Sequence, residues 1–99
     1  MYNTKNLEKL SNLGALAPES MKAFQALDKA ALSDGVIPKK YKELMAIAVA
    51  LTTQCPYCLE IHTKHAKEAG ATDEELAEVT FLTGALRAGA AVTHGTHLI

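Results

Sequence analysis

Apolar residues recur along this chain at intervals of three and four positions, which is the spacing of one face of an α-helix. Near the start, this series is Leu7, Leu10, Leu13 and Leu16. Asn3 or Thr4 can cap the short helix that the series predicts, and Gly14 weakens it near its end. The alternation of apolar and polar residues that is typical of strands is absent from the sequence. The pattern therefore predicts an all-α fold of about five to six helices.

A second helix is predicted to begin at Pro18, because proline suits the first turn of a helix. Its apolar stripe consists of Met21, Phe24, Leu27 and Ala31. The sequence at 33–35, Ser-Asp-Gly, predicts its end, and Gly35 is suited to the positive φ angle that is common at helix C-termini.

A third helix is predicted to open at Pro38 and to carry the most apolar run of the chain, residues 44–51. A helix that is apolar on every side must be buried on every side. A chain of 99 residues buries only part of its surface and cannot easily surround such a helix. We therefore expect a homo-oligomer, with one face of this helix in the protomer core and the other in an interface. The alternative is a central helix that is covered by its own neighbours.

Pro56 predicts the start of a fourth helix, which runs to about Ala69 and stops at Gly70. This start places Cys55 near the N-cap and Cys58 within the first turn.

A capping box opens the fifth predicted helix, with Thr72 at the cap and Glu75 three residues later. The apolar stripe of this helix is Leu76, Val79, Leu82 or Thr83, and Leu86. Small residues are frequent over 84–91 and indicate a close approach between helices. The sequence allows either a break near Gly89 or one long helix that reaches His97.

The composition is that of an ordinary globular protein, with 48% apolar and 21% charged residues. We expect residues 1–99 to form a single helical domain, since the chain is too short for two cores. A net charge of −1 gives no electrostatic basis for binding nucleic acid. No apolar leader is visible, and the longest apolar run is eight residues, against about 20 for a membrane span. We expect a soluble, cytoplasmic protein that binds neither nucleic acid nor membrane.

The two cysteines of the chain, Cys55 and Cys58, are three positions apart. A disulfide over so short a loop constrains the unfolded chain little, and structural disulfides are rare in a reducing compartment. Catalysis, redox sensing or metal binding explains the pair better. A thiolate at a helix N-terminus has a lowered pKa and is the reactive form of cysteine. His62 lies one turn after Cys58 on the same face, where it can take the thiol proton directly or through a water.

Glu43 is expected to reach the same site from the preceding helix. The connection between the third and fourth helices is short, which favours antiparallel packing. Glu43 lies about ten residues before the turn, or roughly 15 Å along its helix, and His62 lies roughly 10 Å beyond the turn. A glutamate side chain bridges much of this difference. Glu43 can then orient His62 and accept its proton, which completes a relay from Cys58.

Two other interpretations of the cysteine pair need comparison. Cys-Pro-Tyr-Cys is also typical of glutaredoxin-like active sites, but those follow a strand, and here a long helix precedes the motif. A zinc site is the second interpretation, with the ligands Cys55, Cys58, His62 and His65. Four ligands within barely three turns of one helix cannot easily surround a tetrahedral ion, so we expect no structural metal, and only adventitious metal binding stays open. His65 is expected to be a helix-surface or interface residue, and His94 and His97 are expected to be packing or interface residues.

The spacing Glu43-x11-Cys55-x2-Cys58-x3-His62, followed by Gly-Ala-Thr-x-Glu-Glu, resembles the carboxymuconolactone decarboxylase family. More narrowly, it is similar to the alkylhydroperoxidase D-like branch, and the match covers about residues 36–92. This combined spacing is much more specific than a Cys-x-x-Cys motif alone.

The resemblance implies an all-α fold whose protomers assemble as trimers or hexamers. It also implies thiol-dependent reduction of hydroperoxides or disulfides, with Cys58 as the nucleophile. His62 and Glu43 serve that nucleophile, and Cys55 resolves the oxidised sulfur as a disulfide. No bound cofactor is expected, and the reductant is an external dithiol or disulfide-carrying protein.

Two features separate this chain from relatives of the family. Carboxymuconolactone decarboxylases proper lack the cysteine pair, which argues against decarboxylation. The better-known hydroperoxidases carry a histidine where this chain has Tyr57, and a tyrosine can donate a hydrogen bond but is no base near neutral pH. Two alternatives therefore stay open: a non-redox member that binds or decarboxylates a small molecule, and a helical interaction module with inert cysteines.

Overall fold

The computed structural model describes residues 2–99, and all regular secondary structure within that range is helical. The elements in chain order are the 3-10 helix η1 (Thr4–Lys9), α1 (Leu10–Leu16), α2 (Pro18–Leu32), α3 (Lys39–Thr53), α4 (Pro56–Glu68), α5 (Asp73–His94) and the 3-10 helix η2 (Gly95–Leu98). The predicted all-α fold is confirmed.

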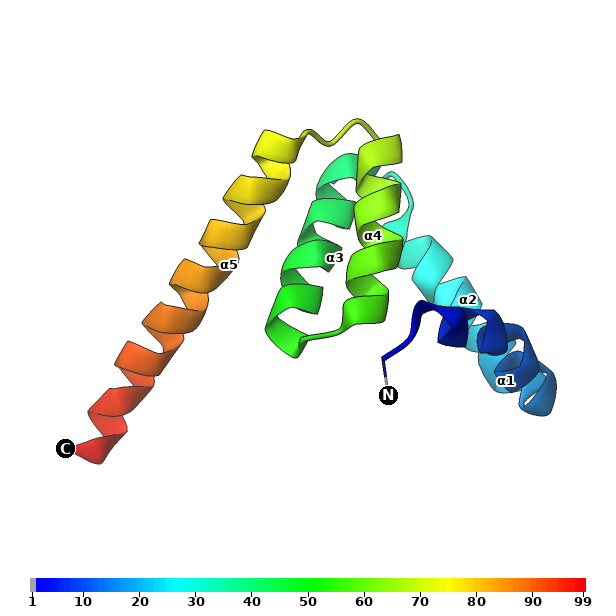
Figure 1. The fold of residues 1–99 in the computed structure, drawn as a ribbon, viewed down its shortest axis with the longest axis horizontal. Helices are drawn as coiled ribbons and strands as arrows, with labels where there is room; N and C mark the ends of the chain where they lie inside the picture. Colours follow the sequence, from blue (N-terminus) through cyan, green and yellow to red (C-terminus); the bar gives the residue numbers. More distant parts are fainter. Residues whose placement is uncertain (1) are drawn as a thin grey trace.

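Helices α3 and α4 form an antiparallel pair at the centre of the molecule (Figure 1). The long helix α5 slants along the other side of α3, to which it packs. The segment η1, α1 and α2 forms an arm on the opposite side of the pair, in which α1 folds back against α2. Helix α3 is therefore the element that packs against both α4 and α5.

The N-terminal arm follows the sequence pattern in outline. The first predicted helix begins as a 3-10 helix, which Asn3 caps by accepting a backbone N–H two residues later at 3.0 Å. Pro18 occupies the first turn of α2, as predicted. The prediction of a positive φ at Gly35 is wrong, because Ser33 already ends α2 with an extended backbone. Within residues 2–99, the glycine with a positive φ is Gly70, at 98°.

Helix α3 begins one residue later than the sequence pattern predicts. Pro38 is its N-cap residue and does not form part of the first turn. The carboxylate of Asp34 accepts the backbone N–H of Lys39 at 2.6 Å and so satisfies one of the free N–H groups at the start of α3. At the other end, Gln54 adopts a left-handed conformation, with φ at 54°, and turns the chain into α4.

The core of the protomer is small and lies between α3, α4 and α5. Its buried apolar residues are Leu44, Ile47, Ala50 and Ala66, and Leu51, Leu59, Ala71, Leu76 and Val79 pack against this cluster. From α5, Thr83 faces inward in place of Leu82, since their exposed fractions are 7% and 59%. Helix α3 is buried on one face only, because Met45 and Val49 stay exposed.

Helix α5 begins at the predicted capping box. The Thr72 hydroxyl accepts the Glu75 N–H at 3.1 Å, and the Glu75 carboxylate accepts the Thr72 N–H at 2.9 Å. The same carboxylate lies 2.8 Å from Nζ of Lys40, so the cap also ties α5 to α3. Of the two outcomes that the sequence allows, the structure shows the long helix, which passes Gly89 unbroken and continues as η2 from Gly95.

We expect Thr72→Ala to lower the free energy of unfolding by about 1 kcal/mol, because it removes the hydroxyl that satisfies a free N–H of α5. Urea denaturation at fixed protein concentration measures this loss. Thr80→Ala, on an exposed turn of the same helix, is the matched control and should change the stability by less than about 0.5 kcal/mol. Equal losses in both variants would refute the role of the cap.

The protomer is extended and exposes much apolar surface. Its accessible area is 7532 Å², whereas about 5,500 Å² is expected for a folded monomer of this mass. Its radius of gyration is 16.2 Å, against about 13 Å for a compact domain of 100 residues. Large apolar side chains are exposed on α1, α2, α3 and α5, among them Leu16, Phe24, Val49, Phe81 and Leu86. No helix within residues 2–99 is long and apolar enough to cross a lipid bilayer.

Candidate dithiol active site

Cys55 and Cys58 lie at the start of α4 and are joined by a disulfide, with their Cα atoms 5.3 Å apart. Cys55 is the N-cap residue and Pro56 occupies the first turn, as the sequence predicts. The backbone N–H of Cys58 donates to Sγ of Cys55 at 3.3 Å. The helix N-terminus therefore interacts with the sulfur of Cys55. Both cysteines are partly exposed, which leaves the disulfide accessible.

Glu43 and His62 meet across the α3–α4 pair. Nδ1 of His62 lies 2.7 Å from Oε2 of Glu43. The antiparallel packing thus brings the two side chains together, as predicted from their similar distances to the turn between the helices. Glu43 is fully buried, at 0% exposure. A carboxylate only accepts hydrogen bonds, so Nδ1 of His62 carries a proton. In the neutral imidazole, Nε2 is then the free acceptor of the ring.

Lys39 lies one turn before Glu43 on α3 and also contacts the Glu43 carboxylate. Its Nζ donates to Oε1 of Glu43 at 2.9 Å. Burial raises the pKa of Glu43, but the hydrogen bonds and positive charges of Lys39 and His62 outweigh burial and hold this pKa below its usual value. Glu43 is therefore ionised near neutral pH and acts as a fixed hydrogen-bond acceptor for His62.

His65 also lies beside Glu43, although it was expected to be a surface or interface residue. Its Nδ1 is 3.8 Å from Oε1 of Glu43, and its side chain is 43% exposed. The rings of His62 and His65 meet edge to face, with centroids 6.1 Å apart. The signal in the sequence is the His-x-x-His spacing, because side chains three apart are neighbours on a helix. The site thus contains one carboxylate and two imidazoles.

Tyr57, between the two cysteines, is held by the N-terminal segment. Its hydroxyl accepts the side-chain amide of Asn6 at 2.8 Å and the backbone N–H of Asn3 at 3.2 Å. The ring of Tyr2 lies 4.8 Å from the ring of Tyr57. The tyrosine that distinguishes this motif therefore anchors residues 2–6 beside the cysteine pair.

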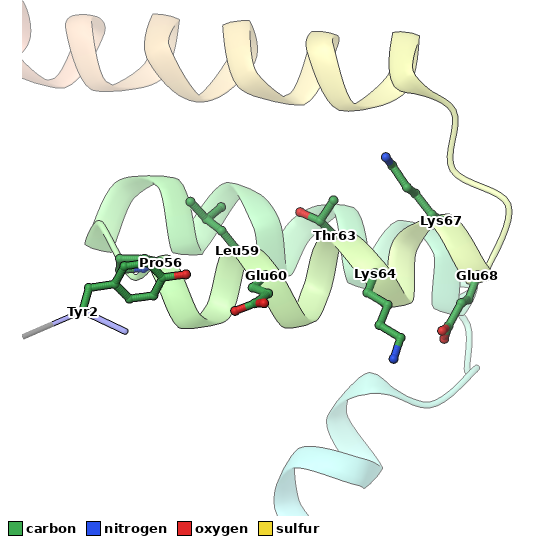
Figure 2. A pocket seen from close by; sticks show the side chains of 8 residues that line it. All are labelled: Tyr2, Pro56, Leu59, Glu60, Thr63, Lys64, Lys67 and Glu68. Carbon is green, nitrogen blue, oxygen red and sulfur yellow. The ribbon is translucent and has the colours of Figure 1, made fainter. Parts of the chain in front are cut away.

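An open groove runs along α4, and Figure 2 shows the side chains that line it. They are Tyr2, Pro56, Leu59, Glu60, Thr63, Lys64, Lys67 and Glu68. At 3.6 residues per turn, the α4 positions among them centre on the side of the helix opposite His62. Only the Pro56 end of the groove adjoins the disulfide. This broad groove, the usual first choice for a ligand site, is therefore separate from the Glu43 cluster.

His94 is the last residue of α5, and His97 lies in the following 3-10 helix, η2. Their rings contact each other edge to face, with centroids 5.1 Å apart. Both residues are exposed in the protomer, and their role in packing or in an interface stays a prediction.

Comparison with known proteins agrees with the family that the sequence resembles and with the all-α fold. The model of the carboxymuconolactone decarboxylase family matches residues 18–99. A crystal structure of a carboxymuconolactone decarboxylase family protein from Legionella pneumophila, in its apo form, is similar to this chain with a TM-score of 0.80 and 34% identity. That similarity covers 94% of this chain and 84% of the other. A protein from Methanobacterium thermoautotrophicum gives a TM-score of 0.77 at 30% identity, over 83% of this chain and 92% of the other.

Two curated relatives are similar in sequence. Uncharacterized protein 4 in the cox locus of Paracoccus denitrificans is 47% identical over 72 residues, which are 73% of this chain and 65% of that protein. An uncharacterized protein of Cupriavidus necator is 46% identical over 67 residues, 68% of this chain and 59% of that protein. The matched region thus spans less than two thirds of either relative. Because the family model matches most of its length, the chain belongs to the carboxymuconolactone decarboxylase family.

Proposed function

We propose that this chain is a thiol-dependent peroxidase or disulfide reductase of the alkylhydroperoxidase D-like branch. The observation that carries the proposal is the pair formed by the buried Glu43 and His62, one turn after Cys58. Burial of a charge is costly unless it is paired, so this arrangement fixes the tautomer and the orientation of the imidazole. Neither a structural disulfide nor a helical interaction module needs such an oriented base.

The first step is the activation of Cys58 in the reduced protein. Nε2 of His62 takes the thiol proton, and Glu43 stabilises the imidazolium through the 2.7 Å contact at Nδ1. The thiolate then attacks an oxygen of the hydroperoxide, so that an S–O bond forms as the O–O bond breaks. The departing alkoxide takes the proton from His62 and leaves as the alcohol. Cys58 becomes a sulfenic acid, oxidised by two electrons.

The second step regenerates the disulfide that the structure shows. The thiolate of Cys55 attacks the sulfenic sulfur of Cys58, an S–S bond forms, and the hydroxyl leaves with one proton as water. An external dithiol then reduces the disulfide through two thiol–disulfide exchanges and is itself oxidised to a disulfide. A reducing cytoplasm supplies such dithiols, which is why we place the protein there.

The test of this function is dithiol-dependent consumption of hydroperoxide by the purified chain. Each hydroperoxide consumed should yield one alcohol and one Cys55–Cys58 disulfide. When excess dithiol is present, the consumption should continue for many turnovers per protomer. Consumption no faster than in a protein-free control, with the disulfide reduced and the fold intact, would refute the function.

We further propose that protomers assemble into a trimer or hexamer. The accessible area exceeds that of a typical monomer by about 2,000 Å², and a standard interface buries about 800 Å² on each partner. The excess thus corresponds to at least two contacts per protomer, as in a closed ring. The exposed apolar faces of α3 and α5, with Val49, Phe81 and Leu86, supply the surface for such contacts.

A charge in this surface should weaken the assembly. Phe81 is 78% exposed in the protomer, so Phe81→Glu leaves the protomer core intact but buries a carboxylate in the interface. Sedimentation velocity should show wild type as a trimer or hexamer and Phe81→Glu shifted toward monomer at micromolar concentration. Glu78→Gln, at an exposed polar position of the same helix, should sediment as wild type does. A monomeric wild type would contradict the proposed assembly.

A further inference from the structure

One group of side chains in the structure has a composition that suits a metal ion. Within residues 2–99, Glu43, His62 and His65 are the group of three or more potential ligands whose donor atoms all lie within 4.8 Å of one another. Around a tetrahedral zinc ion, with bonds of about 2.1 Å, donor atoms lie about 3.4 Å apart. Nδ1 of His62 and Nδ1 of His65 lie 2.7 Å and 3.8 Å from the two oxygens of Glu43, distances on either side of that spacing.

The surroundings of the cluster supply a rigid anchor and a route of access. Glu43 is fully buried and lies in the packed α3–α4 interface, so its carboxylate is fixed in place. His65 is 43% exposed and lines a pocket of about 320 Å³ together with Lys39, Glu68 and Ala69. The pocket therefore connects solvent to His65 and Lys39, the two side chains that lie beside Oε1 of Glu43.

The position beside Oε1 of Glu43 already holds a positive charge. Nζ of Lys39 lies 2.9 Å from this oxygen and its side chain is 42% exposed, so it can swing into water when another cation takes its place. The Lys39 ammonium group therefore competes with a metal ion for Oε1 of Glu43. A divalent ion carries twice the charge of the ammonium group. It can also be coordinated by the two imidazoles, which an ammonium group cannot use as ligands.

We propose that Glu43, His62 and His65 bind Zn²⁺ as a two-histidine, one-carboxylate site, in which the ion displaces the Lys39 ammonium group. Two histidines and one carboxylate are a known set of three protein ligands for zinc, with water or substrate in the fourth position. This site differs from the cysteine-containing zinc site considered from the sequence, because it takes its third ligand from α3 and needs neither sulfur.

Zinc at this site would also prevent His62 from acting as the base of the proposed peroxidase. This consequence rests on the proposed function. His62 faces Glu43 with Nδ1, and a metal on Nδ1 leaves the single proton of the neutral ring on Nε2. Nε2 then has no lone pair with which to accept the Cys58 proton. Zinc is therefore expected to inhibit the dithiol chemistry without touching either cysteine.

The test is titration of the chelator-treated, disulfide form with ZnCl2 by isothermal titration calorimetry, without reductant or peroxide. The disulfide form keeps the thiols from binding the ion, so the result does not depend on whether the peroxidase proposal is correct. Wild type should bind one Zn²⁺ per protomer. His65→Ala should weaken binding at least about tenfold, since even the loss of an outer-shell partner costs roughly 10–100-fold in affinity.

Two further variants distinguish this site from adventitious binding. Lys39→Met removes the competing cation and should bind zinc more tightly than wild type. His97→Ala breaks the other His-x-x-His pair, which forms no ion pair with a carboxylate within residues 2–99, and should bind zinc as wild type does. The proposal is overturned if the oxidised wild type binds no zinc, if Lys39→Met fails to tighten binding, or if His97→Ala loses as much affinity as His65→Ala.

Discussion

Cys58→Ser is expected to abolish dithiol-dependent consumption of hydroperoxide, a loss of at least about a thousandfold. A serine hydroxyl has nearly the size of the thiol but stays protonated beside a single imidazole, and it cannot form a disulfide with Cys55. Because Cys58 is only partly buried at the start of α4, the exchange should leave the helices in place. Steady-state hydroperoxide consumption and the far-ultraviolet circular dichroism spectrum measure the two effects.

Cys55→Ser is the matched control for this variant. It removes the resolving thiol but keeps Cys58, His62 and Glu43, so one rapid turnover per protomer should remain while the steady-state rate collapses. If Cys58→Ser retains the wild-type rate, the peroxidase mechanism is wrong. If Cys58→Ser keeps the single fast turnover and Cys55→Ser loses it, the roles of the two sulfurs are reversed.

Glu43→Gln is the second variant with a large expected effect, a loss of about a hundredfold or more in the rate of Cys58 oxidation. The amide has the shape of the carboxylate but no charge, so it does not stabilise the imidazolium of His62, and it can offer its N–H₂ group to the ring in place of an acceptor. His62 then loses both its preferred tautomer and the negative charge that faces its ring. Stopped-flow measurement of the rate of thiol oxidation determines this loss.

The same substitution should also reduce stability, by about 1–2 kcal/mol, because a buried acceptor loses its charge-assisted bonds. Glu78→Gln, at an exposed position of α5, is the control and should leave the oxidation rate and the stability unchanged. If Glu43→Gln lowers stability but oxidises as fast as wild type, Glu43 has a structural role only.

The core of the candidate site could be predicted from local sequence rules. Pro56 fixes the start of α4, so the positions of Cys55 and Cys58 follow from helix capping. The contact of Glu43 with His62 follows from antiparallel packing across a short turn, because residues at similar distances from the turn lie side by side. These features depend on neighbours in sequence or on one helix pair, and the sequence pattern determines both.

Other features depend on tertiary geometry that no local rule contains. The approach of His65 to Glu43 depends on the rotation of α4 about its axis, and the same spacing also allows a surface position. The inward position of Thr83 in place of Leu82 depends on how α5 lies on α3. The groove and the anchoring of Tyr57 by Asn6 depend on the N-terminal arm returning to α4. Each of these contacts joins segments that approach only in the folded chain.

The most direct test of the central claim is to identify the sulfur that a hydroperoxide oxidises first. Reduced Cys55→Ser is treated with one equivalent of hydroperoxide and a sulfenic-acid trapping reagent, and the modified residue is located by peptide mass spectrometry. We expect a trapped sulfenic acid on Cys58, which should form much more slowly in the double variant that carries both Cys55→Ser and Glu43→Gln. An unmodified Cys58 in the variant, with rapid and equivalent oxidation of Cys55 in Cys58→Ser, would contradict it.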